Sequence, residues 1–445
     1  MYLIYNAHVV NEGRVFKGSV LVDGDSIEAI YKKEPPKDIM EKSEVIDASD
    51  CWLLPGVIDD HVHFRDPGNG ESGDFHTESR AAVAGGVTSV MDMPNTNPPT
   101  IDLKSWENKM SMAATKSMCN FSCYIAATDD NLPQLLSADA SRLCGVKFFM
   151  GTTTGSMALK NAGSVDRLFR EVKLPIAVHA EDDEIIKKNI EHYKNLYKDK
   201  IPVNCHSGIR SEDACFRASA KAVDMALKYG TRLHLAHVST QKELALFKNV
   251  PVDNKSITCE VCVHYLLFSS NDYEIYGTKI KCNPAIKSEN DRKSLLAALA
   301  TDKIDVVATD HAPHTWEAKQ GDALTAASGM PGVQFSLPLM LELAKKGETG
   351  VETVVEKMCH NPAKLFGIEK RGFIRKGFKA DLVIVARNKH WSLTKDKILS
   401  KCGWSPYENR SFTTQVQYTF VNGIPVFKNG EFNETARGQE LSFVR

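Results

Sequence analysis

The sequence predicts an α/β protein: a (β/α)8 TIM-type barrel with a small accessory β-sandwich formed by the N- and C-terminal segments. Two observations predict this fold. In the middle of the chain, short apolar strands alternate with helical stretches, and eight strand candidates can be counted, the number that closes a barrel. At both ends, short alternating strands are joined by tight turns.

The two ends of the chain show the same pattern of short strands and tight turns. Asn422-Gly423 lies between two apolar runs, and Asn-Gly in such a place is the strongest short hairpin signal. We expect residues 1–52 and 370–445 to form one accessory β domain and residues 53–369 to form the barrel. The strands expected in the accessory domain are Leu3–Val10, Val20–Val22, Ile27–Ile30, 380–385, Gln415–Val421 and Ile424–Phe427.

The barrel strands follow one another with helical segments between them. An open doubly wound sheet is the alternative arrangement, but no Gly-x-Gly-x-x-Gly fingerprint follows any strand, so a closed barrel is favoured. The eight expected strands are 53–64, 87–93, 121–128, 144–150, 175–180, 232–238, 256–262 and 304–310.

Composition describes an ordinary globular protein. The 445 residues carry a formal net charge of −1, which gives no reason to expect nucleic acid or an anionic membrane as a partner. No apolar stretch approaches the ~20 residues that span a bilayer, and the N-terminus lacks the pattern of a signal peptide. The 11 cysteines are scattered and odd in number. We therefore expect a cytoplasmic protein with reduced thiols.

The most informative residues come at the end of the first barrel strand. His61 and His63 are two apart, so on a strand their imidazoles point the same way, and neutral imidazole is a common zinc ligand. Arg65 lies one step further along the same face, where its planar fork suits a carboxylate. This pattern predicts an enzyme that acts on a small acidic molecule.

Other polar residues lie where later strands end, and in a (β/α)8 barrel such residues meet at one face. A single histidine at a strand end is more often structural than a ligand. That interpretation fits poorly here, because four histidines and an aspartate end four strands of one barrel. We expect a structural role for His234, since it points to the opposite face from His237 and lies earlier in its strand, and we leave His206 and His264 undecided. The residues at the later strand ends are Asn95, Lys147, His179, His237, Asp310 and His314.

Lys147 stands between Val146 and Phe148 in an apolar strand, where an unpaired ammonium is costly. It could pair with a barrel carboxylate such as Asp310. Alternatively, an amine of lowered pKa could react with CO₂ to give a carbamate that bridges two metals. The residues alone leave both interpretations open.

Taken together, these motifs resemble the amidohydrolase superfamily, and within it the cyclic amidases, namely dihydroorotases, allantoinases and hydantoinases. The resemblance covers nearly the whole chain. It rests on Pro55-Gly56-Val57-Ile58-Asp59, on Thr309-Asp310-His311-Ala312-Pro313-His314, on 360–367, on 379–383 and on 403–407. It implies a metal-dependent hydrolase of cyclic amides with a TIM-type barrel.

Carried over by position, the resemblance implies two zinc ions. His61, His63 and Asp310 would bind one, His179 and His237 the other, and carboxylated Lys147 would bridge them. Asp310 would also be the catalytic acid–base.

Arg65 together with Met93-Pro94-Asn95-Thr96 is similar to the class I dihydroorotases, where the arginine and asparagine grip the substrate carboxylate. The resemblance then implies reversible conversion of dihydroorotate to N-carbamoyl-L-aspartate in pyrimidine synthesis. Further substrate contacts would come from Asn283, His314, Ser328 and Gly329. The alternatives are another cyclic amidase (allantoinase, or hydantoinase/dihydropyrimidinase) and a non-catalytic scaffold relative. A homodimer, and association with another enzyme of the same pathway, are both compatible with this expectation.

Overall fold

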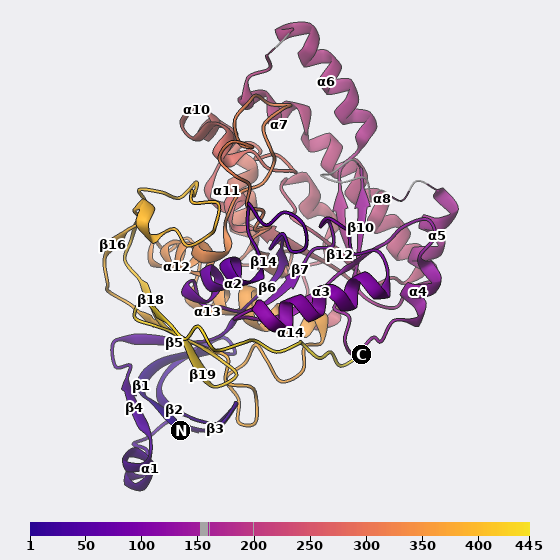
Figure 1. The fold of residues 1–445 in the computed structure, drawn as a ribbon. Coiled ribbons are helices and arrows are strands. Elements are labelled where there is room, and N and C mark those ends of the chain that lie inside the picture. Colours follow the sequence, from indigo (N-terminus) through magenta and orange to yellow (C-terminus); the bar gives the residue numbers. More distant parts are fainter. Residues whose placement is uncertain (152–158, 160, 199) are drawn as a thin grey trace.

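A computed structural model describes residues 1–151, 159, 161–198 and 200–445. It contains a barrel surrounded by helices and a separate β-sheet at one end (Figure 1). Helix α6 (Asp183–Tyr197) projects from the barrel at the end of the molecule opposite this sheet. The predicted α/β barrel with a separate β domain is confirmed.

The accessory sheet joins the two ends of the chain. Its path runs β20-β19-β18-β15-β5-β1-β2-β3, with β4 pairing to β1, so the strands expected as a sandwich are hydrogen-bonded as one nine-stranded sheet. The predicted Asn422-Gly423 hairpin turn links β18 to β19. The strands are β1 Tyr2–Asn11, β2 Arg14–Asp23, β3 Ser26–Tyr31, β4 Glu44–Asp47, β5 Cys51–Pro55, β15 Leu382–Ala386, β18 Gln415–Val421, β19 Ile424–Lys428 and β20 Glu431–Phe432.

The barrel strands are parallel and follow one another around the barrel. They form two hydrogen-bonded runs, β6-β7-β8 and β9-β10-β11-β12-β13-β14. The expected single strand 121–128 is divided at Tyr124 into β8 and β9, so these nine strands correspond to the eight expected ones. A parallel bridge between Val62 and His311 connects the first strand to the segment after the last one. The strands are β6 Val57–Val62, β7 Val87–Asp92, β8 Asn120–Cys123, β9 Ile125–Ala126, β10 Val146–Met150, β11 Ile176–Ala180, β12 Leu233–Leu235, β13 Ile257–Cys262 and β14 Val306–Ala308.

The expected single strand 53–64 is wrong, because this segment is two strands in different sheets. β5 ends at Pro55 in the accessory sheet and β6 begins at Val57 in the barrel. Gly56 makes the transition next to Thr88, whose Oγ1 would lie 2.1 Å from a Cβ at this position. A side chain on residue 56 would therefore separate the first two barrel strands.

Helices connect the barrel strands and cover their outer faces. Several begin at side chains that accept hydrogen bonds from the first turn, as Asp74, Asp102 and Ser288 do. The helices after the first barrel strand are α2 Phe75–Ala84, α3 Leu103–Lys116, α4 Leu132–Ser137, α5 Ala162–Glu171, α6 Asp183–Tyr197, α7 His206–Ile209, α8 Glu212–Tyr229, α9 Val263–Leu267, α10 Tyr273–Tyr276, α11 Glu289–Ala298, α12 Ser336–Lys345, α13 Val351–Val355 and α14 Asn361–Phe366. Helix α1 (Lys37–Lys42) instead lies between β3 and β4 of the accessory sheet. Two short strands, β16 Trp391–Ser392 and β17 Ser411–Phe412, pair with each other.

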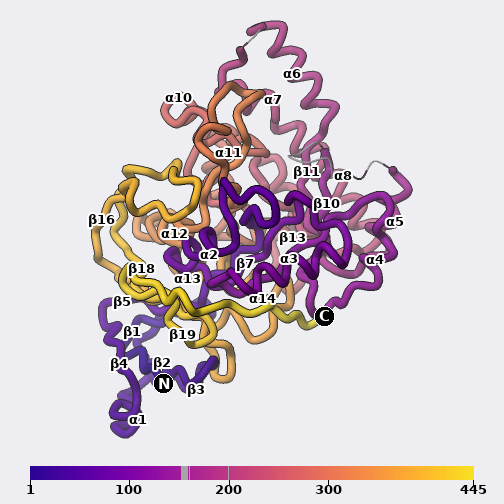
Figure 2. The backbone as a smooth tube through the Cα atoms, in the orientation of Figure 1, coloured from indigo at the N-terminus to yellow at the C-terminus, as the bar shows by residue number. Residues whose placement is uncertain are grey.

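The last residues leave the accessory sheet and return to the barrel, where the backbone passes beside α3 (Figure 2). Leu441 N donates to Phe121 O, and Phe443 N donates to Ser141 O. The boundaries near residues 52 and 370 stay a prediction.

Two expectations from composition can be compared with the structure. All 11 cysteines are free thiols, as predicted. Within the described ranges, no helix is both long and apolar enough to cross a membrane.

Candidate active site

A pocket opens where the barrel strands end, and it brings together nearly all of the predicted site residues. Gly329 is the predicted residue that does not line it. The lining residues are His61, His63, Arg65, Asn95, Lys147, Phe149, His179, His237, Asn283, Asp310, Ala312, His314 and Ser328.

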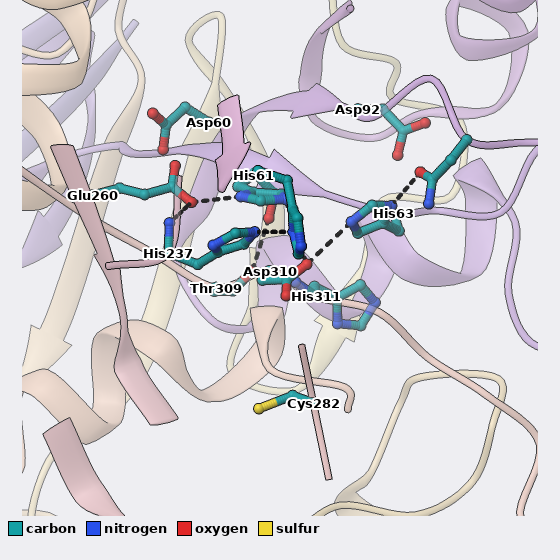
Figure 3. A network of polar contacts seen from close by, with 12 residues as sticks. Asp60, His61, His63, Asp92, His237, Glu260, Cys282, Thr309, Asp310 and His311 are labelled. Carbon is teal, nitrogen blue, oxygen red and sulfur yellow. Dashed lines mark hydrogen bonds and ion pairs between the residues drawn. The ribbon is translucent and has the colours of Figure 1, made fainter. Parts of the chain in front are cut away.

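Three of the predicted metal ligands meet on one side of this pocket. Asp310 Oδ1 lies 3.0 Å from His63 Nε2 and 3.4 Å from His61 Nε2. Figure 3 shows these side chains pointing toward one another from the end of β6, from the residue that follows it and from the segment after β14. Burial alone would raise the pKa of Asp310, but His61 and His63 lower it below its usual value. Asp310 is therefore a carboxylate.

The second predicted group lies beside the first. His179 Nδ1 and His237 Nε2 are 2.8 Å apart, and the ring centroids of His61 and His237 are separated by 5.3 Å. Burial lowers the pKa of both His179 and His237, which keeps these imidazoles neutral. Neutral imidazole is the form that binds metal.

Lys147 lies in β10 and is 1% exposed. Among the residues that the structure describes, its Nζ has no hydrogen-bond partner, so the expected alternative of a direct pair with Asp310 is not seen. Burial lowers the pKa of this amine. A buried amine without a partner, at the pocket wall, is suited to chemical modification.

In three of the four histidines, one ring nitrogen contacts a side-chain oxygen of another residue. His61 Nδ1 contacts Glu260 Oε1, His63 Nδ1 lies 2.7 Å from Asn95 Oδ1, and His179 Nε2 lies 2.9 Å from Glu181 Oε2. Such partners fix the tautomer and the orientation of metal-binding imidazoles.

Glu260 and Glu181 were missed in the sequence. Glu260 gave a signal, because it is an acidic residue in an apolar strand, the same pattern that singled out Lys147.

These contacts also test whether the site fits a metal. A carboxylate or amide oxygen can only accept a hydrogen bond, so the ring nitrogen that contacts it carries the hydrogen. In a neutral ring the other nitrogen then has a lone pair, and this lone pair faces the pocket. Lone pairs on His61 and His63 then face the carboxylate of Asp310, and the three ligand atoms lie within 4.8 Å of one another. A cation among these three atoms, a metal ion or a proton on a ring nitrogen, makes this arrangement favourable. The residues fit a metal ion.

The backbone is strained at three of the site residues. Arg65, His237 and Asp310 have φ values of 73°, 39° and 45°, in the left-handed region that non-glycine residues rarely adopt. Such strain collects at functional sites. β12 ends at Leu235, so the regular alternation of side chains along a strand, which set His234 apart from His237, does not extend to His237.

Arg65 and His314 lie together at one side of the pocket. The Arg65 Nε donates to Pro313 O at 2.9 Å, and one of its terminal nitrogens lies 3.2 Å from His314 Nε2. Burial, and then the charge of Arg65, lower the pKa of His314 to about 3, so His314 is neutral. His314 Nε2 also lies 3.1 Å from Ser328 O, which links it to the other side of the pocket.

The other expected substrate contacts lie in the same region. Asn283 Oδ1 lies 3.1 Å from His206 Nε2, which gives the undecided His206 a place next to the pocket. Gly329 lies against His314, whose Nε2 would be 3.0 Å from a Cβ added there. His264 is buried, and burial lowers its pKa to about 4.

A second histidine–carboxylate group lies deeper in the barrel. His234 Nε2 is 3.2 Å from both Asp60 Oδ2 and Glu260 Oε2, and all three side chains are buried. Figure 3 shows Asp60 and Glu260 on the far side of His61 from Asp310. The structural role expected for His234 agrees with these contacts.

The parallel barrel, the ligand cluster at its strand ends and the accessory sheet define a metal-dependent hydrolase. The family model described as "Amidohydrolase family" matches residues 52–426, so the chain belongs to the amidohydrolase family.

Among its relatives, a protein named dihydroorotase from Halobacterium salinarum is 34% identical over 403 residues, which cover 90% of each chain. One of the same name from Pyrococcus furiosus is 32% identical and covers 99% of this chain and 96% of its own. Among solved structures, an L-hydantoinase (dihydropyrimidinase) from Arthrobacter aurescens superposes with a TM-score of 0.91 at 27% identity, covering 99% of each chain.

Proposed function

We propose that this chain is a dihydroorotase, which interconverts dihydroorotate and N-carbamoyl-L-aspartate. The observation that carries the proposal is Arg65, whose guanidinium lines the pocket beside the ligand cluster. Dihydroorotate differs from simple dihydropyrimidines by a carboxylate on the ring, and a guanidinium is the side chain best shaped to bind one. The relatives named dihydroorotase, at 34% and 32% identity, support the same choice.

The proposed site holds two zinc ions. His61, His63 and Asp310 would hold one, His179 and His237 the other, and Lys147, carboxylated on its amine, would join them. When bound, zinc supplies an acidified water as nucleophile and polarises the amide carbonyl. The unpartnered Nζ of Lys147 supports its modification.

Asp310 would carry the proton. Its lowered pKa keeps it a carboxylate, which can accept a proton during attack and deliver it to the departing ring nitrogen. Reading these steps backwards gives ring closure.

Arg65 and Asn95 would fix the substrate carboxylate. The Oδ1 of Asn95 is engaged by His63, which leaves its amide N–H groups for the substrate. Asn283, His314, Ser328 and Gly329 would position the ring. A small-molecule substrate is all that this proposal requires; a homodimer, a pathway partner and a cytoplasmic location stay predictions.

A hydantoinase or dihydropyrimidinase is the second candidate, and the likeness to the Arthrobacter aurescens enzyme favours it. The two candidates differ in what they require of Arg65, because a neutral ring has no carboxylate to bind.

The test compares turnover of dihydroorotate with that of dihydrouracil, hydantoin and allantoin. We expect dihydroorotate to be the best substrate, and Arg65→Met to lower its kcat/KM by about 10²–10³-fold while zinc content is unchanged. Faster cleavage of a neutral ring by the unchanged protein would reject the substrate assignment. Substoichiometric zinc together with no turnover of any ring would favour the non-catalytic scaffold.

A further inference from the structure

Lys319 is a fully buried lysine that lies outside the group of proposed metal ligands. Its exposed fraction is 0%, and its Nζ donates to three backbone carbonyls, Lys281 O at 3.0 Å, Ala327 O at 2.8 Å and Gly329 O at 2.8 Å. An ammonium has three donors, so all of them are used. In the described part of the chain, no carboxylate forms an ion pair with it.

The three carbonyls belong to two separate segments. One contains Lys281 and, two residues later, Asn283; the other contains Ser328 and Gly329. Both Asn283 and Ser328 line the pocket. A direct backbone bond from Gly329 N to Lys281 O at 2.9 Å connects the same segments. Lys319 is therefore bonded to both segments that approach the substrate from this side.

A second lysine acts on the same segment. Lys281 Nζ donates to Ser328 Oγ at 3.0 Å and to Ala326 O. Trp404 lies next to this arrangement: the Lys319 ammonium is 5.6 Å from its ring centroid, and its Nε1 donates to His314 O at 2.8 Å. The contacts thus extend to the residue that touches Arg65.

Burying an ammonium without a carboxylate costs free energy, and burial, then the charge of Lys281, lower the pKa of Lys319 to about 7. The three carbonyls lie in irregular backbone, where no helix or sheet ladder supplies donors, and among the described residues only Lys281 O has a backbone donor, Gly329 N. Lys319 Nζ donates to all three and so joins them at one point. Loop residues that contact a substrate need such support to keep one geometry.

We propose that Lys319 is a positioning residue that holds segments 281–283 and 326–329 in the geometry that binds the substrate. It acts through Asn283, Ser328 and Gly329 and touches no reacting atom. This inference rests on the proposed function for the identity of the substrate only. The prediction is a loss of substrate affinity that is separate from metal binding and from the chemical step.

The test is Lys319→Met, which keeps the length of the side chain and removes its charge and donors. We expect KM for dihydroorotate to rise by at least about 10-fold, with kcat changed much less and zinc content unchanged. Lys255→Met is the matched control. Lys255 is also buried, but it pairs with Asp305 at the opposite end of the barrel, so its loss should lower the melting temperature without changing KM.

Unchanged KM in a folded, zinc-loaded Lys319→Met protein would overturn the proposal, as would an equal rise in Lys255→Met. Should Lys319→Met not fold, Lys281→Met must show the KM increase, and unchanged KM there overturns the proposal as well. If the wild-type protein does not cleave dihydroorotate, the proposed function fails, and the same comparison is made on the ring that it cleaves best.

Discussion

Two buried groups in this barrel are built from the same residue types and differ in their protonation. His61, His63 and Asp310 face the pocket, whereas Asp60, His234 and Glu260 lie beneath it. In the upper group burial lowers the pKa of His63 to about 3. In the deeper group burial alone would also lower the pKa of His234, but its bonds to Asp60 and Glu260 raise it to about 9.

The ratio of histidine to carboxylate explains this difference. His63 lies against a single carboxylate, that of Asp310, which does not offset the effect of burial, so its ring keeps a lone pair for a metal. One imidazole between two carboxylates takes a proton, because the two negative charges cannot be buried side by side without a cation. His234 is thus a buried cation, and it helps keep Glu260 ionised as the partner of His61.

The largest effect is expected in the upper group. Asp310→Asn keeps the shape of the side chain but removes the proton acceptor, so kcat should fall by about 10³-fold or more. Steady-state kinetics at saturating zinc measure this loss. Asp60→Asn is the matched change in the deeper group and should reduce kcat far less. Equal losses in the two variants would contradict the division of roles.

The next effect is on stability. His234→Gln leaves Asp60 and Glu260 without their cation and should lower the free energy of unfolding by about 3–5 kcal/mol. Urea unfolding of the zinc-free protein measures it. A double-mutant cycle with Asp60→Asn should give a favourable coupling between the two side chains. Independent, additive losses would show that His234 is not held as a cation.

Raising the pH should act on the same residue. Because the folded-state pKa of His234 is about 9 and the unfolded value is 6.5, its contribution is complete below pH 6.5 and is lost as the pH rises through 9. The expected loss is about 3 kcal/mol. Unfolding free energies at pH 6 and pH 9.5 measure it, and the His234→Gln protein should lack this part of the pH dependence.

Lowering the pH should reveal the opposite behaviour at His314. Its folded-state pKa of about 3 lies below the unfolded 6.5, so the unfolded chain binds the extra proton and stability falls as the pH drops below 6.5. At pH 5 the expected cost is about 2 kcal/mol. The slope of stability against pH between 7 and 5 should be smaller in His314→Asn; an unchanged slope would mean that His314 is already protonated in the folded protein.

The sequence predicted the strand ends of the upper group well, because residues at the carboxyl ends of parallel strands meet whatever their separation in the chain. It could not predict Glu260 as the partner of His61, since a pairing across the barrel depends on the register of strands that are not neighbours in sequence. Glu181 lies two residues after His179, and their contact depends on side-chain orientation, which the pattern of the strand does not fix. Lys319 lies in an irregular segment with no periodicity. No pattern in the neighbouring residues indicates that its ammonium group is buried.

The failure at 53–64 has a different cause. The apolar run continues without a break in hydrophobicity, and only Pro55-Gly56 marks the point where one sheet ends and the other begins. Hydrophobic pattern alone does not distinguish one long strand from two strands in different sheets.

The junction at Gly56 also constrains the order in which the protein is assembled during synthesis. β5 pairs with β1 along one edge and with β15 along the other. β15 is translated only after the whole barrel, so the strand that leads directly into His61 and His63 keeps an open edge throughout elongation. Open edges recruit foreign strands. Chains truncated before Leu382 should therefore aggregate, even though every proposed metal ligand is already present in them.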